Sequence, residues 1–248
     1  MDMRVAILSD IHFPYENPQA WKLTLKILRL LHPEKILLLG DLFDFEPISR
    51  FVVHPHKRVE FQSQILYSQK RLLELRNHTP NARINLLDGN HEKRMQTYLY
   101  TKAPELHDLD ALTIPELFKL KTFDIQHLPW GTRQSIGKLN FCHGDEIRVG
   151  GVAPARNLYQ KVSTNLLTGH FHRIDRYIHR QYNGEVYGVW TNGCLCTLDP
   201  QWTILPQWQL GMSVVDFTKS GFFAVDQLLY MQEQKKLHCM VHGQLVSV

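Results

Sequence analysis

Five short blocks of the sequence carry side chains that can bind metal ions. They are Asp10-Ile11-His12, Gly40-Asp41-Leu42-Phe43-Asp44, Gly89-Asn90-His91-Glu92, His143-Gly144 and Gly169-His170-Phe171-His172. The candidate ligands in them are Asp10, His12, Asp41, Asn90, His143, His170 and His172. These are too many oxygen and nitrogen ligands for one zinc ion, whereas a shared carboxylate with imidazoles and an amide suits two divalent transition metals about 3.5–4 Å apart. The blocks therefore predict a dinuclear metal site.

Two cations held in this way suit the hydrolysis of a phosphate ester. They lower the pKa of a bound water, and the resulting hydroxide can attack phosphorus while both cations stabilise the phosphoryl charge. The leaving oxygen then needs a proton, and an imidazole is the natural donor at neutral pH. His91 is placed for that role. Asp44 is either the N-cap of a helix or the residue that orients His91.

Four of the five blocks directly follow an apolar run typical of a buried strand, as ligands at one edge of a sheet would require. Asp10 and His12 are two residues apart and would project in the same direction from an extended strand end.

We expect strands over residues 4–8, 36–39, 84–87, 123–127, 138–142, 165–168, 177–181, 185–190, 213–217, 222–230 and 237–248. We expect helices over residues 19–31, 60–76, 93–101 and 153–162, with a further helix starting near 113–117. Alternating strands and helices in the first half predict a parallel sheet with right-handed crossovers. Asn183-Gly184 predicts a hairpin, and the chain beyond residue 172 should be largely antiparallel.

Composition describes an ordinary globular protein. The chain has 248 residues, 44% of them apolar and 21% charged, with a formal net charge of +4 that permits an anionic substrate without demanding nucleic acid. The first nine residues lack the features of a secretion signal, and no run approaches the roughly 20 apolar residues needed to cross a bilayer. We therefore expect one cytoplasmic domain, residues 1–248, with no membrane span. We expect Cys194 and Cys196 to be small core residues of a reduced protein rather than a metal or redox site.

The five blocks resemble the motifs of the calcineurin-like metallophosphoesterase superfamily, D-x-H, G-D-x-x-D, G-N-H-[ED], H-G and G-H-x-H, in full and in order. The resemblance implies an α/β fold, a four-layer α/β-β/α sandwich of two mixed sheets flanked by helices. It also implies that Asp10, His12, Asp41 and His172 bind one metal, and that Asp41, Asn90, His143 and His170 bind the other, with Asp41 bridging. His91 would be the catalytic acid, supported by Asp44.

Positions where this chain departs from the superfamily motifs narrow the range of expected substrates. Protein Ser/Thr phosphatases have an arginine after the second aspartate of the G-D block, where this chain has Phe45, so a phosphoprotein substrate is disfavoured. Arg94 and Arg148 are candidates for phosphate binding, with surface ion pairs as the alternative for both. We interpret residues 45–59 as a substrate-side loop in which His54 and His56 are further candidates, although a solvated basic loop explains these charges equally well.

The run Gly89-Asn90-His91-Glu92-Lys93-Arg94, together with Ala103-Pro104-Glu105-Leu106 and Gly193-Cys194-Leu195-Cys196, is similar to small phosphoesterases of phages and prophages. This favours phosphodiesters of nucleic acid or nucleotides as substrates. A phosphomonoesterase and a nucleotide-linked pyrophosphatase stay open as alternatives. A metal- or nucleic-acid-binding module would be favoured by a missing ligand or acid, and none is missing. Mn suits the mixed oxygen and nitrogen ligands, and Fe, Zn or Ni are acceptable. The oligomeric state is not predicted.

Overall fold

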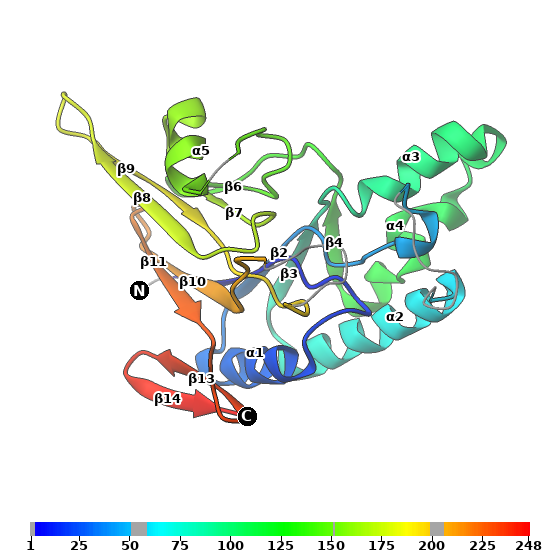
Figure 1. The fold of residues 1–248 in the computed structure, drawn as a ribbon, viewed down its shortest axis with the longest axis horizontal. Coiled ribbons are helices and arrows are strands. Elements are labelled where there is room, and N and C mark those ends of the chain that lie inside the picture. The colour runs from blue at the N-terminus through cyan, green and yellow to red at the C-terminus, as the bar shows by residue number, and fades with distance from the viewer. Residues whose placement is uncertain (1–2, 51–58, 151, 199–205) are drawn as a thin grey trace.

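A computed structural model describes residues 3–50, 59–150, 152–198 and 206–248 (Figure 1). Its larger sheet has six strands in the spatial order β11 (Phe223–Leu229), β10 (Gly211–Phe217), β1 (Met3–Leu8), β2 (Lys35–Leu39), β3 (Arg83–Leu87) and β4 (Ile125–Leu128). Strands β1 to β4 are parallel, and β10 and β11 extend the sheet in antiparallel pairing. The predicted parallel sheet with helical crossovers is thus confirmed for the first half of the chain.

The smaller sheet has five strands in the order β5 (Gln134–Ile136), β6 (Leu139–Cys142), β7 (Leu166–Thr168), β9 (Val186–Thr191) and β8 (Asp175–Arg180). The hairpin predicted at Asn183-Gly184 joins β8 to β9, with Gly184 at a φ of 88°. The expectation of antiparallel pairing beyond residue 172 is wrong at β9, which pairs in parallel with β7. A hairpin signal determines how its two strands pair with each other. It does not determine which strand from earlier in the sequence either of them will pair with.

Helices cover the outer faces of both sheets (Figure 1). The α-helices are α1 (Pro18–Leu31), α2 (Phe61–His78), α3 (Lys93–Lys102), α4 (Ile114–Leu117) and α5 (Pro154–Val162), and the 3₁₀ turns are η1 (Glu46–Ile48), η3 (Pro104–Leu106), η4 (Asp110–Leu112) and η5 (Leu120–Phe123). Helices α1 and α2 lie on the larger sheet and α5 on the smaller one. The predicted α/β sandwich of two mixed sheets flanked by helices is therefore confirmed.

The apolar strand runs are explained by burial on two sides. In β2, Ile36 and Leu38 pack toward the helices, whereas Leu37 and Leu39 pack into the core between the two sheets. Because successive side chains of a strand point to opposite faces, a strand between two cores needs apolar residues at every position. The same alternation is found in β1 and β10. The parallel pairing of β1 to β4 brings the carboxyl ends of these strands to one edge of the sandwich.

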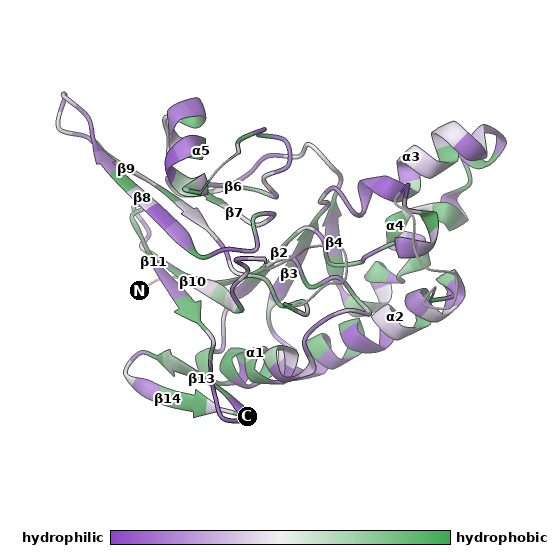
Figure 2. Ribbon diagram, in the orientation of Figure 1, coloured by the Kyte–Doolittle hydropathy of each residue, from purple (hydrophilic) through white to green (hydrophobic). Residues whose placement is uncertain are grey.

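The C-terminal segment differs from its prediction. Residues 237–248 form a hairpin of β13 (Lys236–Val241) and β14 (Gln244–Ser247), not a single strand, and β12 (Met231–Glu233) completes a three-stranded sheet. The turn uses His242 and Gly243 with φ values of 47° and 80°. Asparagine, aspartate or glycine usually precedes the glycine of such a two-residue turn, so histidine there gave only a weak turn signal in the sequence. Figure 2 shows hydrophobic residues along α1 and along β13 and β14 beside it.

Core residues far apart in the sequence, such as Ala6 and Val246, belong to one hydrophobic cluster. This contiguity supports the proposal that residues 1–248 are a single domain, because separate domains would each form their own core. Among the residues described, no helix has both the length and the apolar character that crossing a bilayer requires.

Candidate functional site

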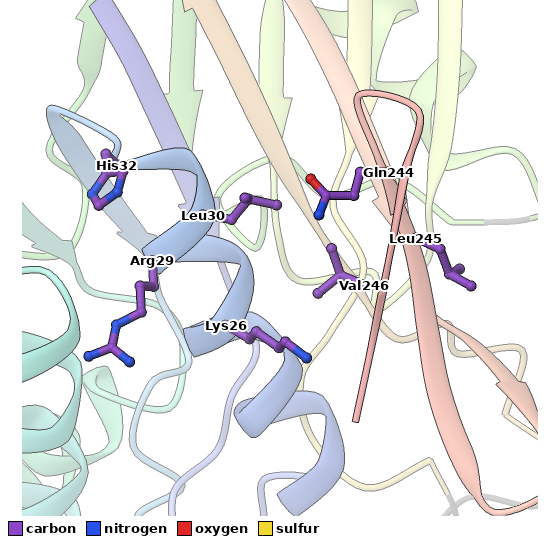
Figure 3. A pocket seen from close by; sticks show the side chains of 7 residues that line it. All are labelled: Lys26, Arg29, Leu30, His32, Gln244, Leu245 and Val246. Atoms are coloured by element: carbon purple, nitrogen blue, oxygen red, sulfur yellow. The ribbon is translucent and has the colours of Figure 1, made fainter.

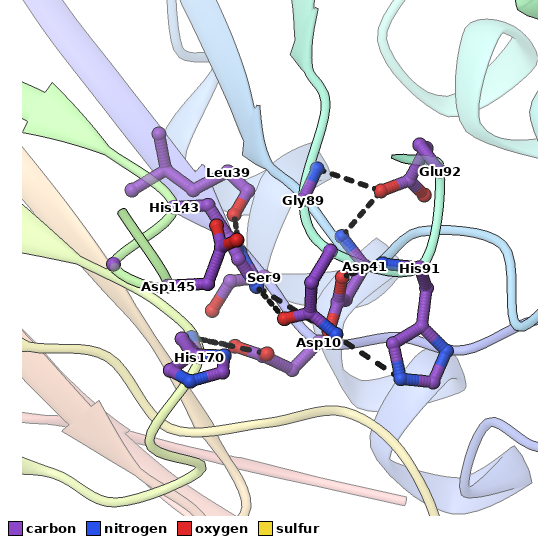
Figure 4. A network of polar contacts seen from close by, with 12 residues as sticks. Ser9, Asp10, Leu39, Asp41, Gly89, His91, Glu92, His143, Asp145 and His170 are labelled. Atoms are coloured by element: carbon purple, nitrogen blue, oxygen red, sulfur yellow. Dashed lines mark hydrogen bonds and ion pairs between the residues drawn. The ribbon is translucent and has the colours of Figure 1, made fainter. Parts of the chain in front are cut away.

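All five motif blocks begin within two residues of the end of a strand, at the carboxyl edge where the two sheets meet (Figure 4). Strands β1, β2 and β3 of the larger sheet lead into the blocks at Asp10, Gly40 and Gly89. Strands β6 and β7 of the smaller sheet lead into those at His143 and Gly169. Two separate sheets thus deliver the predicted ligands to one place, which no single strand or helix could do.

The loops reach this place through an unusual backbone. Asp10 and His12 have φ values of 54° and 56°, so the expectation of an extended strand end is wrong, although their side chains do point into the same place. Asp41, His170 and His172 also lie in the left-handed region, with φ values of 51°, 68° and 54°. Such residues cost of the order of 1–3 kcal/mol each and persist where surrounding contacts hold them. Here the Asp10 and His12 amides donate hydrogen bonds to the carbonyls of Gly40 and Asp41.

Asp41 lies at the centre of the site. Its Oδ2 is 3.3 Å from His143 Nε2 and 3.8 Å from the Nε2 atoms of both His12 and His91. Its Oδ1 accepts a hydrogen bond of 2.9 Å from the His91 amide. Burial by itself would raise the pKa of Asp41, but His143, His91 and His12 around it hold that pKa well below its usual range. The carboxylate is therefore charged and directed at several imidazoles at once.

One group of candidate ligands joins Asp41 to the loop after β1. His172 Nε2 is 3.1 Å from Asp10 Oδ1 and 3.3 Å from His12 Nε2. Two imidazole nitrogens that face each other at this distance next to buried carboxylates converge as ligands of a common cation would. Asp10, His12 and Asp41 offer ligand atoms within 4.8 Å of one another. This group can hold a divalent metal.

A second group shares Asp41 and lies toward the smaller sheet. Asp41, His143 and His170 also offer ligand atoms within 4.8 Å of one another. His143 Nδ1 donates to the Leu39 carbonyl at 2.6 Å, which leaves Nε2 free to face Asp41 and Asn90 Oδ1, the latter at 3.3 Å. A backbone carbonyl on the far nitrogen is the usual way of orienting a metal-binding imidazole. Asp41 is thus common to two potential metal positions.

His91 lies beside both groups without being enclosed by either. Its Nδ1 donates to the Asp44 carbonyl at 2.9 Å and is 3.3 Å from Asp44 Oδ2. Burial lowers the pKa of His91, but Asp41 and Asp44 outweigh it and raise the pKa above its ordinary value. The same Asp44 carboxylate is 3.2 Å from His12 Nδ1, so one buried side chain orients two imidazoles of the site. Asp44 therefore lies where the sequence suggested, beside His91.

The two arginines named from the sequence differ in position. The Arg94 guanidinium lies inside the site, where Nη2 is 2.9 Å from His91 Nε2 and Nη1 donates to the Asp44 carbonyl at 2.9 Å. Arg148 is exposed, and within the described residues its recorded contact is made by its carbonyl, which accepts a hydrogen bond from Lys161. The structure therefore brings Arg94 to the predicted ligands and does not bring Arg148 to them.

Glu92 belongs to the site although the sequence suggested no role for it. Its Oε2 accepts the amides of Asp41 and Gly89 at 2.9 and 2.8 Å, and its Oε1 accepts those of Leu42 and Phe43 at 2.9 Å each. Burial and the nearby Asp41 and Asp88 raise the pKa of Glu92 to about 7, against the pull of these amides. One buried carboxyl group thus ties the loop after β2 to the turn after β3. Its position three residues after the turn glycine was the signal available in the sequence.

Replacing Glu92 with glutamine is expected to destabilise the fold by about 3 kcal/mol, because two of the four amides would then face an NH₂ group and lose charge-assisted hydrogen bonds. That loss corresponds to a fall in Tm of about 6–12 °C for a protein of this size. Urea unfolding measures the free energy, and Glu105→Gln at an exposed site is the matched control. Equal stability of the two variants would contradict the role assigned to the Glu92 carboxyl.

Residues that follow the last motif block in the sequence contact the His172 ring on its Nδ1 side and on its face. Cys194 and Cys196 are buried free cysteines, and Cys196 Sγ is 3.7 Å from His172 Nδ1. The Trp208 ring packs on the imidazole with 4.2 Å between centroids. The expectation that both cysteines are buried core residues is confirmed. The expectation that they take no part in a metal site is not, because Cys196 offers a ligand atom within 4.8 Å of those of His12 and His172. Trp208 carries no motif, so its part was not visible in the sequence.

The segment expected to be a substrate loop is only partly described. Phe45, the residue that replaces the arginine of the phosphoprotein phosphatases, is fully buried and packs edge-on against Phe118. It is a core residue at this position. His54 and His56 lie outside the described residues.

A hollow of about 420 Å³ lies away from these loops, between α1 and the C-terminal hairpin (Figure 3). It is lined by Lys26, Arg29, Leu30, His32, Gln244, Leu245 and Val246. Three of these residues lie in the C-terminal part of α1, His32 directly follows the helix, and the other three belong to β14. The hollow contains no residue of the five blocks and is a separate feature of the surface.

Comparison with known proteins gives three findings. The model of the calcineurin-like phosphoesterase family matches residues 3–195. The gene 54 protein of Mycobacterium phage L5 is 24% identical over 185 residues, which are 70% of each chain. Among solved structures, a Vps29 mutant from Entamoeba histolytica aligns with 99% of this chain and 97% of its own at 13% identity and a TM-score of 0.45. The phosphoesterase YfcE from E. coli aligns over 90% and 98% at 12% identity and a TM-score of 0.43.

Proposed function

Because the chain belongs to the calcineurin-like phosphoesterase family, we propose that it is a dinuclear metal-dependent phosphoesterase that prefers phosphodiesters of nucleotides or nucleic acid. Asp10, His12, Asp41 and His172 would hold one divalent ion, and Asp41, Asn90, His143 and His170 the other. The observation that carries the proposal is the position of Asp41, whose carboxylate is shared by two groups of closely spaced ligand atoms. Mn is the first candidate for both positions, with Fe, Zn and Ni as alternatives.

The donor set fits these ions. All its members offer carboxylate oxygen, amide oxygen or imidazole nitrogen, which suits Mn and its neighbours. Bound there, the cations would lower the pKa of a water and stabilise charge on the phosphoryl oxygens. The residues of the chain would orient this chemistry: Leu39 holds the His143 ring through Nδ1, and Asp44 holds the rings of His12 and His91.

His91 and Arg94 would act as a coupled pair. In the present geometry Arg94 Nη2 lies 2.9 Å from His91 Nε2, so the guanidinium competes with a proton for this nitrogen. A phosphate group is a better partner for a guanidinium than a neutral imidazole is, because it is charged and accepts two parallel hydrogen bonds. Substrate would therefore draw Arg94 away from His91. Nε2 could then take a proton and donate it to the leaving oxygen, while Nδ1 stays bound to Asp44.

The diester preference is tested directly with two p-nitrophenyl substrates. We expect Mn-dependent hydrolysis of bis-p-nitrophenyl phosphate to exceed that of p-nitrophenyl phosphate, and EDTA to abolish both. Restoration by added Mn is the control for metal removal. Faster monoester hydrolysis would make the protein a phosphomonoesterase. No hydrolysis with Mn, Fe, Zn or Ni would favour a metal- or nucleic-acid-binding module.

The cytoplasmic location stays a prediction from the sequence.

A further inference from the structure

Trp130 lies in residues 129–133, which connect β4 of the larger sheet to β5 of the smaller one. Strand β4 is parallel to β3, so this connection leaves from the edge that carries the motif loops. Its start is tied to the turn after β3, because the Asp88 amide donates to the Leu128 carbonyl at 3.1 Å. Trp130 is therefore at the rim of the candidate site, beside the turn that carries Asn90 and His91.

The Trp130 ring is held by two residues, Asp145 and Lys93, each of which directly follows a motif block. Its Nε1–H donates to the Asp145 carboxylate, with distances of 3.1 and 3.3 Å to the two oxygens. Lys93 Nζ lies over the ring, 3.2 Å from its centroid. Asp145 comes two residues after His143 and appears among the site residues in Figure 4, and Lys93 comes two residues after His91. The orientation of the ring is thus coupled to the loops on both sides of the site.

Although its edge and one face are fixed, the ring is not buried. Trp130 is 38% exposed, whereas Trp21 in the core is 2% exposed. A tryptophan that served only to pack two loops together would gain more free energy by being buried, because its apolar surface is large. An oriented and accessible ring is instead a preorganised surface for a flat ligand, since little side-chain entropy is lost when the ligand binds.

We propose that Trp130 is a stacking platform for the nucleobase of a substrate whose phosphate lies at the metal centre. This proposal rests on the proposed phosphodiesterase function and names its substrate class. Stacking on an aromatic side chain is available to every base, because each has a π-face. Lys93 adds positive charge over the ring, and a cationic group beside an aromatic ring is typical of sites for single-stranded nucleic acid and nucleotides.

The test compares two diesters with the same leaving group, thymidine 5′-(p-nitrophenyl phosphate) and methyl p-nitrophenyl phosphate. For the Mn-loaded Trp130→Ala variant we expect kcat/KM to fall about 5- to 150-fold on the nucleoside diester, from the usual cost of losing one base stack. On the methyl diester it should stay within about twofold, since that substrate has no ring to stack. Trp130→Phe should restore most of the loss. Tyr182→Ala, which removes an exposed aromatic ring from the distant β8–β9 hairpin, is the matched control.

Binding is measured separately from turnover. Thymidine 5′-monophosphate should quench tryptophan fluorescence of the Mn-loaded protein, and this quenching should be lost in Trp130→Phe. If Trp130→Ala lowers both diester activities equally, the ring is only a clamp between loops and the proposal is overturned. If neither diester is hydrolysed, the phosphodiesterase function fails, and the fluorescence titration then decides: quenching that depends on Trp130 supports the platform, and its absence overturns it.

Discussion

Asp41→Asn is expected to lower kcat/KM for bis-p-nitrophenyl phosphate at least about 10³-fold, equivalent to about 4 kcal/mol of transition-state stabilisation. Asparagine has nearly the same shape, and its carbonyl can keep the hydrogen bond from the His91 amide. Its NH₂ group would then take the place of Oδ2, opposite the Nε2 atoms of His143, His12 and His91. An uncharged donor there cannot bridge two cations, so we expect metal content to fall together with activity.

Metal bound per chain, measured by mass spectrometry after gel filtration, separates this result from unfolding. The control is Asp216→Asn on β10, which removes the carboxylate that forms an ion pair with Arg4 on β1. That variant should keep both its metal and its activity. An Asp41→Asn protein with a full complement of metal and normal turnover would exclude Asp41 as a shared ligand.

His91→Ala is expected to retain metal and to lower kcat by about 10²- to 10⁴-fold on diesters with poor leaving groups. The loss should be much smaller with p-nitrophenolate, because a stable anion leaves without being protonated. A series of methyl aryl phosphates with different ring substituents measures this, and the dependence of log kcat on the pKa of the leaving phenol should become steeper in the variant.

The pH dependence has a definite sign. A general acid works in its protonated form, so kcat should fall as pH rises through the pKa of His91, which Asp41 and Asp44 raise against the effect of burial. In the His91→Ala variant, kcat should no longer fall over this pH range. His107→Ala, at an exposed histidine, is the control and should keep it. Unchanged leaving-group dependence in His91→Ala would assign the proton donor elsewhere, with water as the alternative.

The elements of the fold were largely predictable because their signals are local. Apolar runs of four or five residues marked β1, β2 and β3, and near-helical spacing of apolar residues marked α1 over residues 19–31. The helix starts one residue earlier, at Pro18, and Asn17 caps the amides of Gln19 and Ala20. The predictions failed where pairing depends on distant strands or on unusual backbone. β5 was missed, β9 joined β7 in parallel, and the last segment turned back at His242-Gly243.

The sequence by itself determined which residues can bind metal, because motif spacing and donor chemistry are properties of short segments. It also determined that these segments follow strands, and hence that they gather at an edge. Only the tertiary structure decided how they meet. The left-handed conformations of Asp10 and His12, the Glu92 carboxyl that joins two loops, the guanidinium of Arg94 against His91 and the oriented ring of Trp130 all depend on contacts between residues distant in sequence. Such contacts arise from the packing of two sheets against each other, and no local pattern of residue types encodes them.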